Sequence, residues 1–236
     1  MKCLILGANS DIAYEFSKIL YLENYKLILT SRNLENLIKQ KKLLEVSNEI
    51  IIYKFDITEY DKFDNFFLNL DEDIDLIFIT SGYLEKPEIN TDKIIDINFN
   101  GPKRFINQII SNSNKFSNLS KIICITSIAA DRVDYKEQAY TLAKHNLSKF
   151  LFEKNIELKN EKISIKEIKL GYVKTKMTKD LKLSKILTSS PKTVANKIFS
   201  NLSNNKKVIY TPFFWRPIVI LYNIFISFKN FFKFNK

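Results

Sequence analysis

The chain has 236 residues, 45% of them apolar and 27% charged, which is the composition of a folded globular domain and not of a disordered segment. This length suffices for one sizeable α/β core and is too short for two ordinary enzyme domains with a linker. Cys3 and Cys124 lie in separate apolar runs and His145 is the only histidine, so we expect reduced thiols and no metal site. The chain enters an apolar run directly, without a leader for export, and this predicts a cytoplasmic protein.

Short apolar runs alternate with stretches of helical periodicity along residues 1–211. The expected strands are near-continuous apolar runs, typical of parallel strands buried on both faces, and they span residues 3–6, 26–30, 50–55, 76–80, 122–126, 163–169 and 207–210. The expected helices span residues 11–22, 34–46, 59–69, 90–111, 137–158 and 191–203. This alternation predicts an α/β fold, a single Rossmann-like doubly wound parallel sheet of about seven strands with helices on both faces.

The first expected strand is followed by a loop that suits a phosphate group. Its sequence is Gly7-Ala8-Asn9-Ser10-Asp11-Ile12-Ala13, and it opens the first expected helix. A glycine at such a turn allows the backbone close to a phosphate, and the free N–H groups of a helix N-terminus favour negative charge. A simple strand-to-helix turn would look the same, so this loop alone does not decide between the two.

The end of the second expected strand bears on the choice of cofactor. Dinucleotide-binding folds that select NAD usually carry an acidic residue there for the ribose 2′-hydroxyl. This chain has Thr30-Ser31-Arg32 instead, and a guanidinium can hold the 2′-phosphate of NADP through paired hydrogen bonds. Arg32 could also be a surface residue at the start of the next helix. We expect a preference for NADPH, with NADH as the alternative cofactor.

Three Tyr-x-x-x-Lys patterns occur, at Tyr14/Lys18, Tyr140/Lys144 and Tyr172/Lys176. Both residue types are so common in this chain that chance alone would produce such matches. Only Tyr140 and Lys144 lie on an expected helix that follows a strand ending in a serine, Ser127. Residues i and i+4 share a helix face, so both side chains are expected to point into one cleft. A neighbouring ammonium favours the phenolate, which predicts a lowered pKa for Tyr140 and proton transfer to a carbonyl oxygen.

Residues 212–236 form an apolar and basic tail. Residues 181–236 carry ten Lys and Arg and no acidic residue, so the net charge of +11 belongs mainly to the end of the chain. The apolar run between Arg216 and Lys229 is much shorter than the ~20 residues that span a bilayer. At helical spacing the polar residues form one narrow stripe, Arg216, Asn223, Ser227 and Asn230.

Two interpretations of this tail remain open. It could be a last helix packed on the domain or in a dimer interface. It could also lie in a membrane surface through residues 213–236, with its lysines at anionic headgroups. Large apolar runs between the lysines argue against binding to nucleic acid.

Residues 1–215 resemble the short-chain dehydrogenase/reductase family. The matching segments are the loop 7–13, Asp56 after the third strand, Thr80-Ser81-Gly82 after the fourth, Asn98 on the long helix, the set Ser127, Tyr140 and Lys144, and Gly171-Tyr172-Val173-Lys174-Thr175. All four glycines of the chain, the other being Gly101 beside Asn98, fall in these motifs, which an accidental match would not arrange. The resemblance implies an NAD(P)-dependent oxidoreductase acting on CH–OH and C=O groups.

The resemblance also implies roles for individual residues. Ser127 would bind the substrate carbonyl, Tyr140 would donate the proton, Lys144 would hold the nicotinamide ribose, and Asn98 would position a water relay behind Lys144. The residues expected at the cofactor are Gly7, Asn9, Ser10, Asp11, Ile12, Arg32, Asp56, Ile57, Ser81, Gly82, Tyr140, Lys144, Val173 and Thr175. Asp11 replaces a second glycine of many family members, and it would bring a carboxylate close to the pyrophosphate unless it points outward.

Four strings, at 82–84, 98–102, 126–133 and 210–216, are similar to bacterial keto-sugar reductases. The best-known of these are the keto-reductase half of the decaprenylphosphoryl-ribose 2′-epimerase system, in which an FAD-dependent oxidase makes a keto sugar on a polyprenyl phosphate. The similarity implies a lipid-linked keto-sugar substrate in cell-surface polysaccharide or glycolipid synthesis, an FAD-dependent sugar oxidase as partner, and association with the cytoplasmic face of the membrane. Family membership further implies a homo-oligomer formed through the helices near 90–111 and 137–158.

Two other functions stay open. One is the reduction or oxidation of another small carbonyl or alcohol, because one fold hosts many substrates. The other is a catalytically silent, membrane-associated dinucleotide-binding protein. The intact set of Asn98, Ser127, Tyr140 and Lys144 argues against silence, since a silent relative has no physical need for all four.

Overall fold

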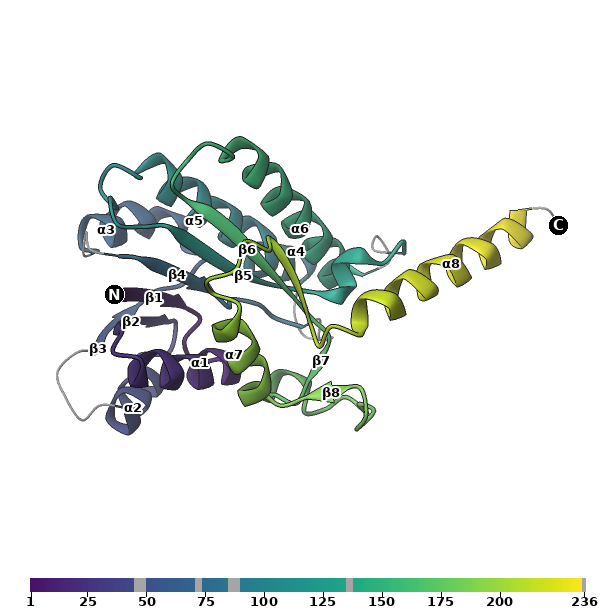
Figure 1. Ribbon diagram of the computed structural model, residues 1–236, viewed down its shortest axis with the longest axis horizontal. Helices are drawn as coiled ribbons and strands as arrows, with labels where there is room; N and C mark the ends of the chain where they lie inside the picture. The colour runs from purple at the N-terminus through teal and green to yellow at the C-terminus, as the bar shows by residue number, and fades with distance from the viewer. Residues whose placement is uncertain (45–49, 71–73, 85–89, 135–137, 235–236) are drawn as a thin grey trace.

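The computed structural model describes residues 1–44, 50–70, 74–84, 90–134 and 138–234, with side chains described as far as Lys229. Within these ranges, seven strands form one parallel sheet in the order β3-β2-β1-β4-β5-β6-β9 (Figure 1). The strands are β1 Lys2–Leu6, β2 Lys26–Ser31, β3 Ile50–Lys54, β4 Leu76–Ile79, β5 Lys121–Ser127, β6 Ser164–Leu170 and β9 Val208–Thr211. All neighbouring strands run parallel, so the predicted doubly wound, Rossmann-like sheet is confirmed.

Helices cover both faces of the sheet. On one face lie α1 (Asp11–Leu22), α2 (Leu34–Leu44) and α7 (Pro191–Ser200), and on the other lie α3 (Phe63–Leu68), α4 (Thr91–Ile95), α5 (Gly101–Ser111) and α6 (Ala139–Glu157) (Figure 1). Side chains alternate along a strand, and so Cys3 and Ile5 enter the core under one layer whereas Leu4 and Leu6 enter the core under the other. Burial on both faces explains why these strands are continuous apolar runs in the sequence.

The two cysteines lie inside this core. Cys3 and Cys124 are buried and free, as expected from their apolar surroundings, and burial raises the pKa of both thiols. A thiol with a raised pKa is a poor nucleophile, so both cysteines act as small core residues.

The helix predicted over residues 90–111 is helical without a break from Thr91 to Ser111, but not as one regular α-helix. Between α4 and α5, residues Asp96–Asn100 form a π-turn. The wider turn contains Asn98, whose side-chain amide donates to the Ile94 carbonyl at 2.8 Å. Single π-turns inside helices are frequent at functional sites.

The other predicted elements differ from the structure mainly at their ends. The helix predicted over 59–69 is a 3-10 turn, Tyr60–Lys62, followed by α3, and the helix predicted over 191–203 ends at Ser200. The end of the helix predicted over 34–46 and the start of the one over 137–158 lie outside the described residues. The sequence did not predict the small sheet of β7 (Tyr172–Val173) and β8 (Thr188–Ser189), because two residues per strand carry no periodicity.

The last helix, α8 (Trp215–Phe234), projects away from the body of the domain (Figure 1). Its base is fixed by Trp215, which is buried against Gly171: a Cβ at that glycine would lie 1.9 Å from Trp215 Nε1. Further along, the Asn223 amide donates to the Asp131 carbonyl at 2.7 Å, and the Tyr222 hydroxyl donates to Asp134 at 2.7 Å. Asn223, a member of the predicted polar stripe, therefore binds the domain.

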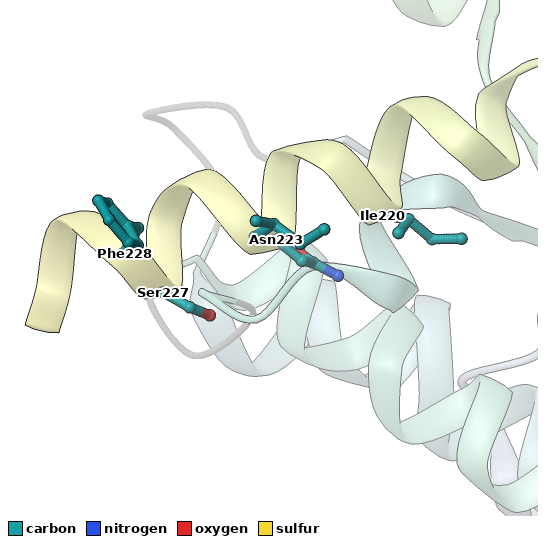
Figure 2. A pocket seen from close by; sticks show the side chains of 5 residues that line it. Ile220, Asn223, Ser227 and Phe228 are labelled. Atoms are coloured by element: carbon teal, nitrogen blue, oxygen red, sulfur yellow. The ribbon is translucent and has the colours of Figure 1, made fainter.

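Four large apolar side chains of α8 are mostly exposed, with exposed fractions of 60–66% for Leu221, Ile224, Phe225 and Phe228. A shallow hollow of about 540 Å³ runs along the helix, and Figure 2 shows four of its lining residues, Ile220, Asn223, Ser227 and Phe228. These four side chains are therefore not packed on their own domain, and for them that interpretation is wrong. The two other interpretations, an interface with a second protein molecule and contact with a membrane surface, stay open. Among the described residues, no helix is long and apolar enough to cross a membrane.

Candidate active site

The carboxyl ends of the parallel strands border a cleft of about 560 Å³. Ligands of open α/β sheets bind at this edge, where the strand order reverses. With the exception of Asn98, every residue predicted for the site lines the cleft: Gly7, Asn9, Ser10, Asp11, Ile12, Arg32, Asp56, Ile57, Ser81, Gly82, Ser127, Tyr140, Lys144, Val173 and Thr175. Residues from seven segments of the chain therefore meet in one cavity.

The loop between β1 and α1 is a tight turn built around Gly7. This residue has a φ of 78°, a conformation that favours glycine, and a Cβ there would lie 2.9 Å from Thr80 Oγ1. Ser10 ends the loop as the N-cap of α1, where its hydroxyl accepts from the Ala13 amide at 3.1 Å. The turn leaves the N-terminus of α1 facing the cleft, an arrangement that suits a pyrophosphate.

Two polar side chains of this loop have partners within the protein. Asn9 Nδ2 donates to Ser31 Oγ at 2.7 Å and to the Asn33 carbonyl at 2.9 Å, so the Asn9 amide braces the loop against the end of β2. Asp11 Oδ2 accepts from the Lys176 backbone amide at 2.7 Å, and Asp11 Oδ1 lies 3.5 Å from Lys176 Nζ. Asp11, which replaces a glycine of many family members, therefore has its carboxylate bound to Lys176.

Arg32 and Asp56 face each other at the end of the cleft that borders β2 and β3. Arg32 Nε lies 3.9 Å from Asp56 Oδ2, and half of the Arg32 side chain is exposed. The other oxygen, Asp56 Oδ1, accepts from the amide and hydroxyl of Thr58, which fixes the carboxylate. The guanidinium keeps most of its donors toward solvent, so it can bind a further anionic group beside Asp56.

Ser127, Tyr140 and Lys144 come together at the other end of the cleft. Ser127 ends β5, and its hydroxyl accepts from the Ala129 amide at 3.2 Å and hydrogen-bonds the Tyr140 phenol. Tyr140 and Lys144 lie one turn apart on α6, with Lys144 Nζ 5.9 Å from the centre of the Tyr140 ring. The i, i+4 spacing thus places both groups on the cleft side of α6, as predicted.

The pKa of Tyr140 moves in the opposite direction to the one predicted. Removal from water raises it, and the hydrogen bond with Ser127 only partly opposes this shift. Burial also lowers the pKa of Lys144 to about 8, so its ammonium is a weakened partner for the phenol. A phenol with a raised pKa stays protonated at neutral pH, which is the form that can donate a proton to a carbonyl oxygen.

Asn98 lies behind the cleft instead of in its wall. Its side chain is fully buried, donates to the carbonyls of Tyr83 and Ile94, and accepts from the Tyr83 amide. A Cβ at Gly82 would lie 3.3 Å from Asn98 Oδ1 and 3.4 Å from Lys144 Nζ, so both groups lie next to this glycine. Both N–H donors of the Asn98 amide are bound to protein carbonyls, so this side chain fixes the segment of Tyr83 beside Lys144.

Sequence reasoning missed two residues that shape the site. Arg132 lines the cleft and is held by Asp134, to which its Nε donates at 2.8 Å. His145 Nδ1 lies 2.9 Å from the Ala130 carbonyl and ties α6 to the segment after Ser127. The low number of arginines was the available signal for Arg132, whereas nothing local in the sequence indicated a partner for His145.

The cleft has the polar groups that a dinucleotide requires. Ser81 Oγ is buried in its wall and has no hydrogen-bond partner within the described part of the chain. With the glycine turn, the N-terminus of α1 and Arg32, this orphaned hydroxyl fits a phosphorylated ligand lying along the strand ends. No group of three or more potential metal ligands occurs among the described residues.

A Rossmann-like sheet with serine, tyrosine and lysine at the end of its cleft is the arrangement of an NAD(P)-dependent oxidoreductase. A family model described as short chain dehydrogenase matches residues 2–185. The chain therefore belongs to the short-chain dehydrogenase/reductase family. Sequence comparison with curated proteins finds no match.

Solved structures share the fold at low sequence identity. A short chain dehydrogenase from Burkholderia cenocepacia in complex with NADP has a TM-score of 0.74 at 17% identity, over 89% of this chain and 86% of that one. A variant of actinorhodin polyketide ketoreductase with NADPH has a TM-score of 0.74 at 17% identity, over 89% and 94%. A 4-hydroxyisoleucine dehydrogenase mutant with NADH and succinate has a TM-score of 0.76 at 19% identity, over 89% and 96%.

Proposed function

We propose that the protein is an NADPH-dependent reductase of a keto group on a lipid-linked sugar, acting in cell-surface polysaccharide or glycolipid synthesis. The observation that carries this proposal is the position of α8. Its base touches two walls of the cleft, through Trp215 at Gly171 and Tyr222 at Arg132, while its outer stretch is apolar and uncovered. A site for a polar head beside an apolar arm suits a substrate with a polar head and a long hydrocarbon chain.

The described residues can perform each part of a ketone reduction. When bound, the dinucleotide supplies a hydride for the carbonyl carbon. Ser127 binds the carbonyl oxygen, and Tyr140 transfers its phenolic proton to that oxygen, so that C=O becomes CH–OH. Lys144 holds the ribose hydroxyls and stabilises the phenolate left on Tyr140.

NADPH is the cofactor that the cleft favours. β2 ends in Thr30 and Ser31 without an acidic residue, and Thr30 is fully buried with its hydroxyl on the Ile5 carbonyl, leaving Arg32 to meet the ribose. Solved relatives of the same fold bind NADP, NADPH or NADH, so both reduced cofactors are tested.

We expect the wild-type protein to use NADPH with a higher kcat/KM than NADH, and the Arg32→Ala variant to lose most of that preference. Loss of a guanidinium–phosphate contact costs about 1.5–3 kcal/mol, or about ten- to a hundredfold in kcat/KM for NADPH. Steady-state kinetics with both cofactors measure the ratio. Equal efficiency of NADPH and NADH in the wild type would contradict the assignment.

The proposal includes contact with the cytoplasmic face of a membrane through residues 213–236. Phe213 is 78% exposed, the outer stretch of α8 is apolar, and the lysines from Lys229 onward can meet anionic headgroups. A lipid-linked substrate would then be presented beside the cleft.

The proposal also includes two protein partners. Phe152 and Ile156 are 64% and 60% exposed on α6, which supports a homo-oligomer that covers this helix. The keto substrate requires prior oxidation of a sugar hydroxyl, and an FAD-dependent sugar oxidase would supply it.

The substrate class is tested with one keto sugar in two forms, free and joined through phosphate to a polyprenyl chain in detergent micelles. We expect NADPH consumption by the full-length protein with a kcat/KM at least about tenfold higher for the lipid-linked form, because the chain adds apolar contact area. Equal kcat/KM for both forms would contradict a lipid-linked substrate and would favour the alternative, a reductase of small carbonyl compounds. A protein that binds NADPH and reduces neither form would contradict the proposed substrate.

A further inference from the structure

A buried carboxylate outside the proposed catalytic set lies beneath the site. Glu167 is on β6, where it is paired in register with Cys124 of β5, and it is only 3% exposed. Carboxylates are rarely buried to this degree unless other groups compensate for their charge. The reaction described above makes no use of Glu167.

Glu167 joins the two elements that carry the proposed catalytic residues. Its Oε1 accepts from Thr126 Oγ1 at 2.6 Å, and Thr126 directly precedes Ser127 on β5. It also hydrogen-bonds the hydroxyl of Ser148, which lies one turn after Lys144 on α6. One side chain therefore ties the end of β5 to the helix of Tyr140 and Lys144.

The charges around this carboxylate are arranged in a chain. Lys169 Nζ lies 3.9 Å from Glu167 Oε1 and forms an ion pair with Asp131, which in turn accepts from the Tyr210 hydroxyl at 2.7 Å. Burial raises the pKa of Glu167, whereas the Lys169 charge, which is shared with Asp131, and the hydrogen bonds from Thr126 and Ser148 favour its carboxylate form. On the α6 side, Glu167 faces the ammonium of Lys144, which is 3% exposed.

We propose that Glu167 is a positioning residue of this reductase, which fixes Ser127 relative to Lys144 and supplies the buried negative charge that keeps the Lys144 ammonium protonated. The groups that face Lys144 are Cys124 from β5, Glu167 from β6 and Tyr140 from its own helix. Cys124 is a buried thiol, and burial raises its pKa so that it stays neutral near pH 8. Glu167 is therefore the carboxylate that offsets the loss of solvent around Lys144. The inference rests on the proposed role of Lys144 in catalysis.

The test follows the protonation of Lys144 directly and needs no substrate. Full-length protein labelled with [ε-13C]lysine is titrated by NMR, with the Lys144 signal identified by its loss in Lys144→Met. In the wild type we expect a midpoint near pH 8, and in Glu167→Gln a midpoint lower by about half a unit or more. The matched control is Glu161→Gln, which removes an exposed carboxylate from the turn before β6 and should leave the midpoint unchanged.

A second variant covers failure of Glu167→Gln to fold. Glu167→Asp keeps the charge but withdraws it by one methylene, and it should give a smaller shift in the same direction. A folded variant of either kind with the wild-type Lys144 midpoint overturns the proposal, even if its thermal stability falls, since a purely structural role predicts that result. Failure to reduce any keto sugar would contradict the proposed function and leave this titration unaffected.

Discussion

The Tyr140→Phe variant should bind NADPH with nearly wild-type affinity and lose reductase activity by about 10²- to 10⁴-fold, the usual contribution of a general acid. The substitution removes the hydroxyl that hydrogen-bonds Ser127 in the cleft and leaves the ring in place. Because burial raises the pKa of Tyr140, the phenol carries its proton at neutral pH, and the variant removes that proton from the site. Cofactor fluorescence measures binding, and NADPH absorbance measures turnover with the keto-sugar substrate.

Tyr14→Phe is the matched control for this variant. Tyr14 belongs to another Tyr-x-x-x-Lys pattern and lies on α1 with Lys18 Nζ 5.2 Å from its ring centre, so its local geometry resembles that of Tyr140. Tyr172, in the third pattern, is less suitable because it lines the cleft and packs edge-on against Trp215. If Tyr14→Phe and Tyr140→Phe lost activity alike, the assignment of the proton donor to Tyr140 would be wrong.

Full-length protein should float with vesicles that contain phosphatidylglycerol at low salt, and a variant with serine at Leu221, Ile224 and Phe225 should remain in the soluble fraction. Each of these side chains is at least 60% exposed, and burying one in the bilayer interface contributes about 1.5–3 kcal/mol. Each lysine near the anionic surface adds about 1 kcal/mol, and salt screens this part. Substitution is preferable to truncation, since Trp215 and Val219 are buried against the domain.

The matched control places serine at Leu43 and Leu68, which are 74% and 77% exposed and lie outside α8. This variant should float like the wild type. If the wild-type protein stays soluble beside anionic vesicles at low salt, the uncovered face of α8 is an interface with another protein molecule. The lipid-linked substrate would then lose its main structural support.

The parts of the site that could be predicted from sequence are those with short-range causes. The glycine turn, the N-cap at Ser10 and the i, i+4 pair of Tyr140 and Lys144 each depend on a few neighbouring residues, and the structure places all of them at one cleft. The parallel, doubly wound sheet follows from continuous apolar runs that alternate with helices.

The parts that could not be predicted depend on residues far apart in the chain. Asp11 is engaged by Lys176, 165 residues away, and no single sequence reveals such a pair. The predicted direction of the Tyr140 pKa shift was wrong. Helical spacing indicates the nearby ammonium of Lys144, but it does not indicate that both groups lose contact with solvent. The π-turn at Asn98 was missed for a similar reason, since its backbone pattern depends on packing.

The joint between α8 and the domain lies in the first half of a 20-residue helix. Trp215 at Gly171, with Tyr222 and Asn223 at the segment 131–134, fixes the helix at several points, so that the arm and the cleft turn as one rigid body. An arm lying in a flat surface would hold the cleft mouth at a constant height and tilt above that surface. Encounters with a lipid-linked substrate would then be collisions between two bodies diffusing in a plane, whose frequency depends on their surface densities and not on concentration in the surrounding solution.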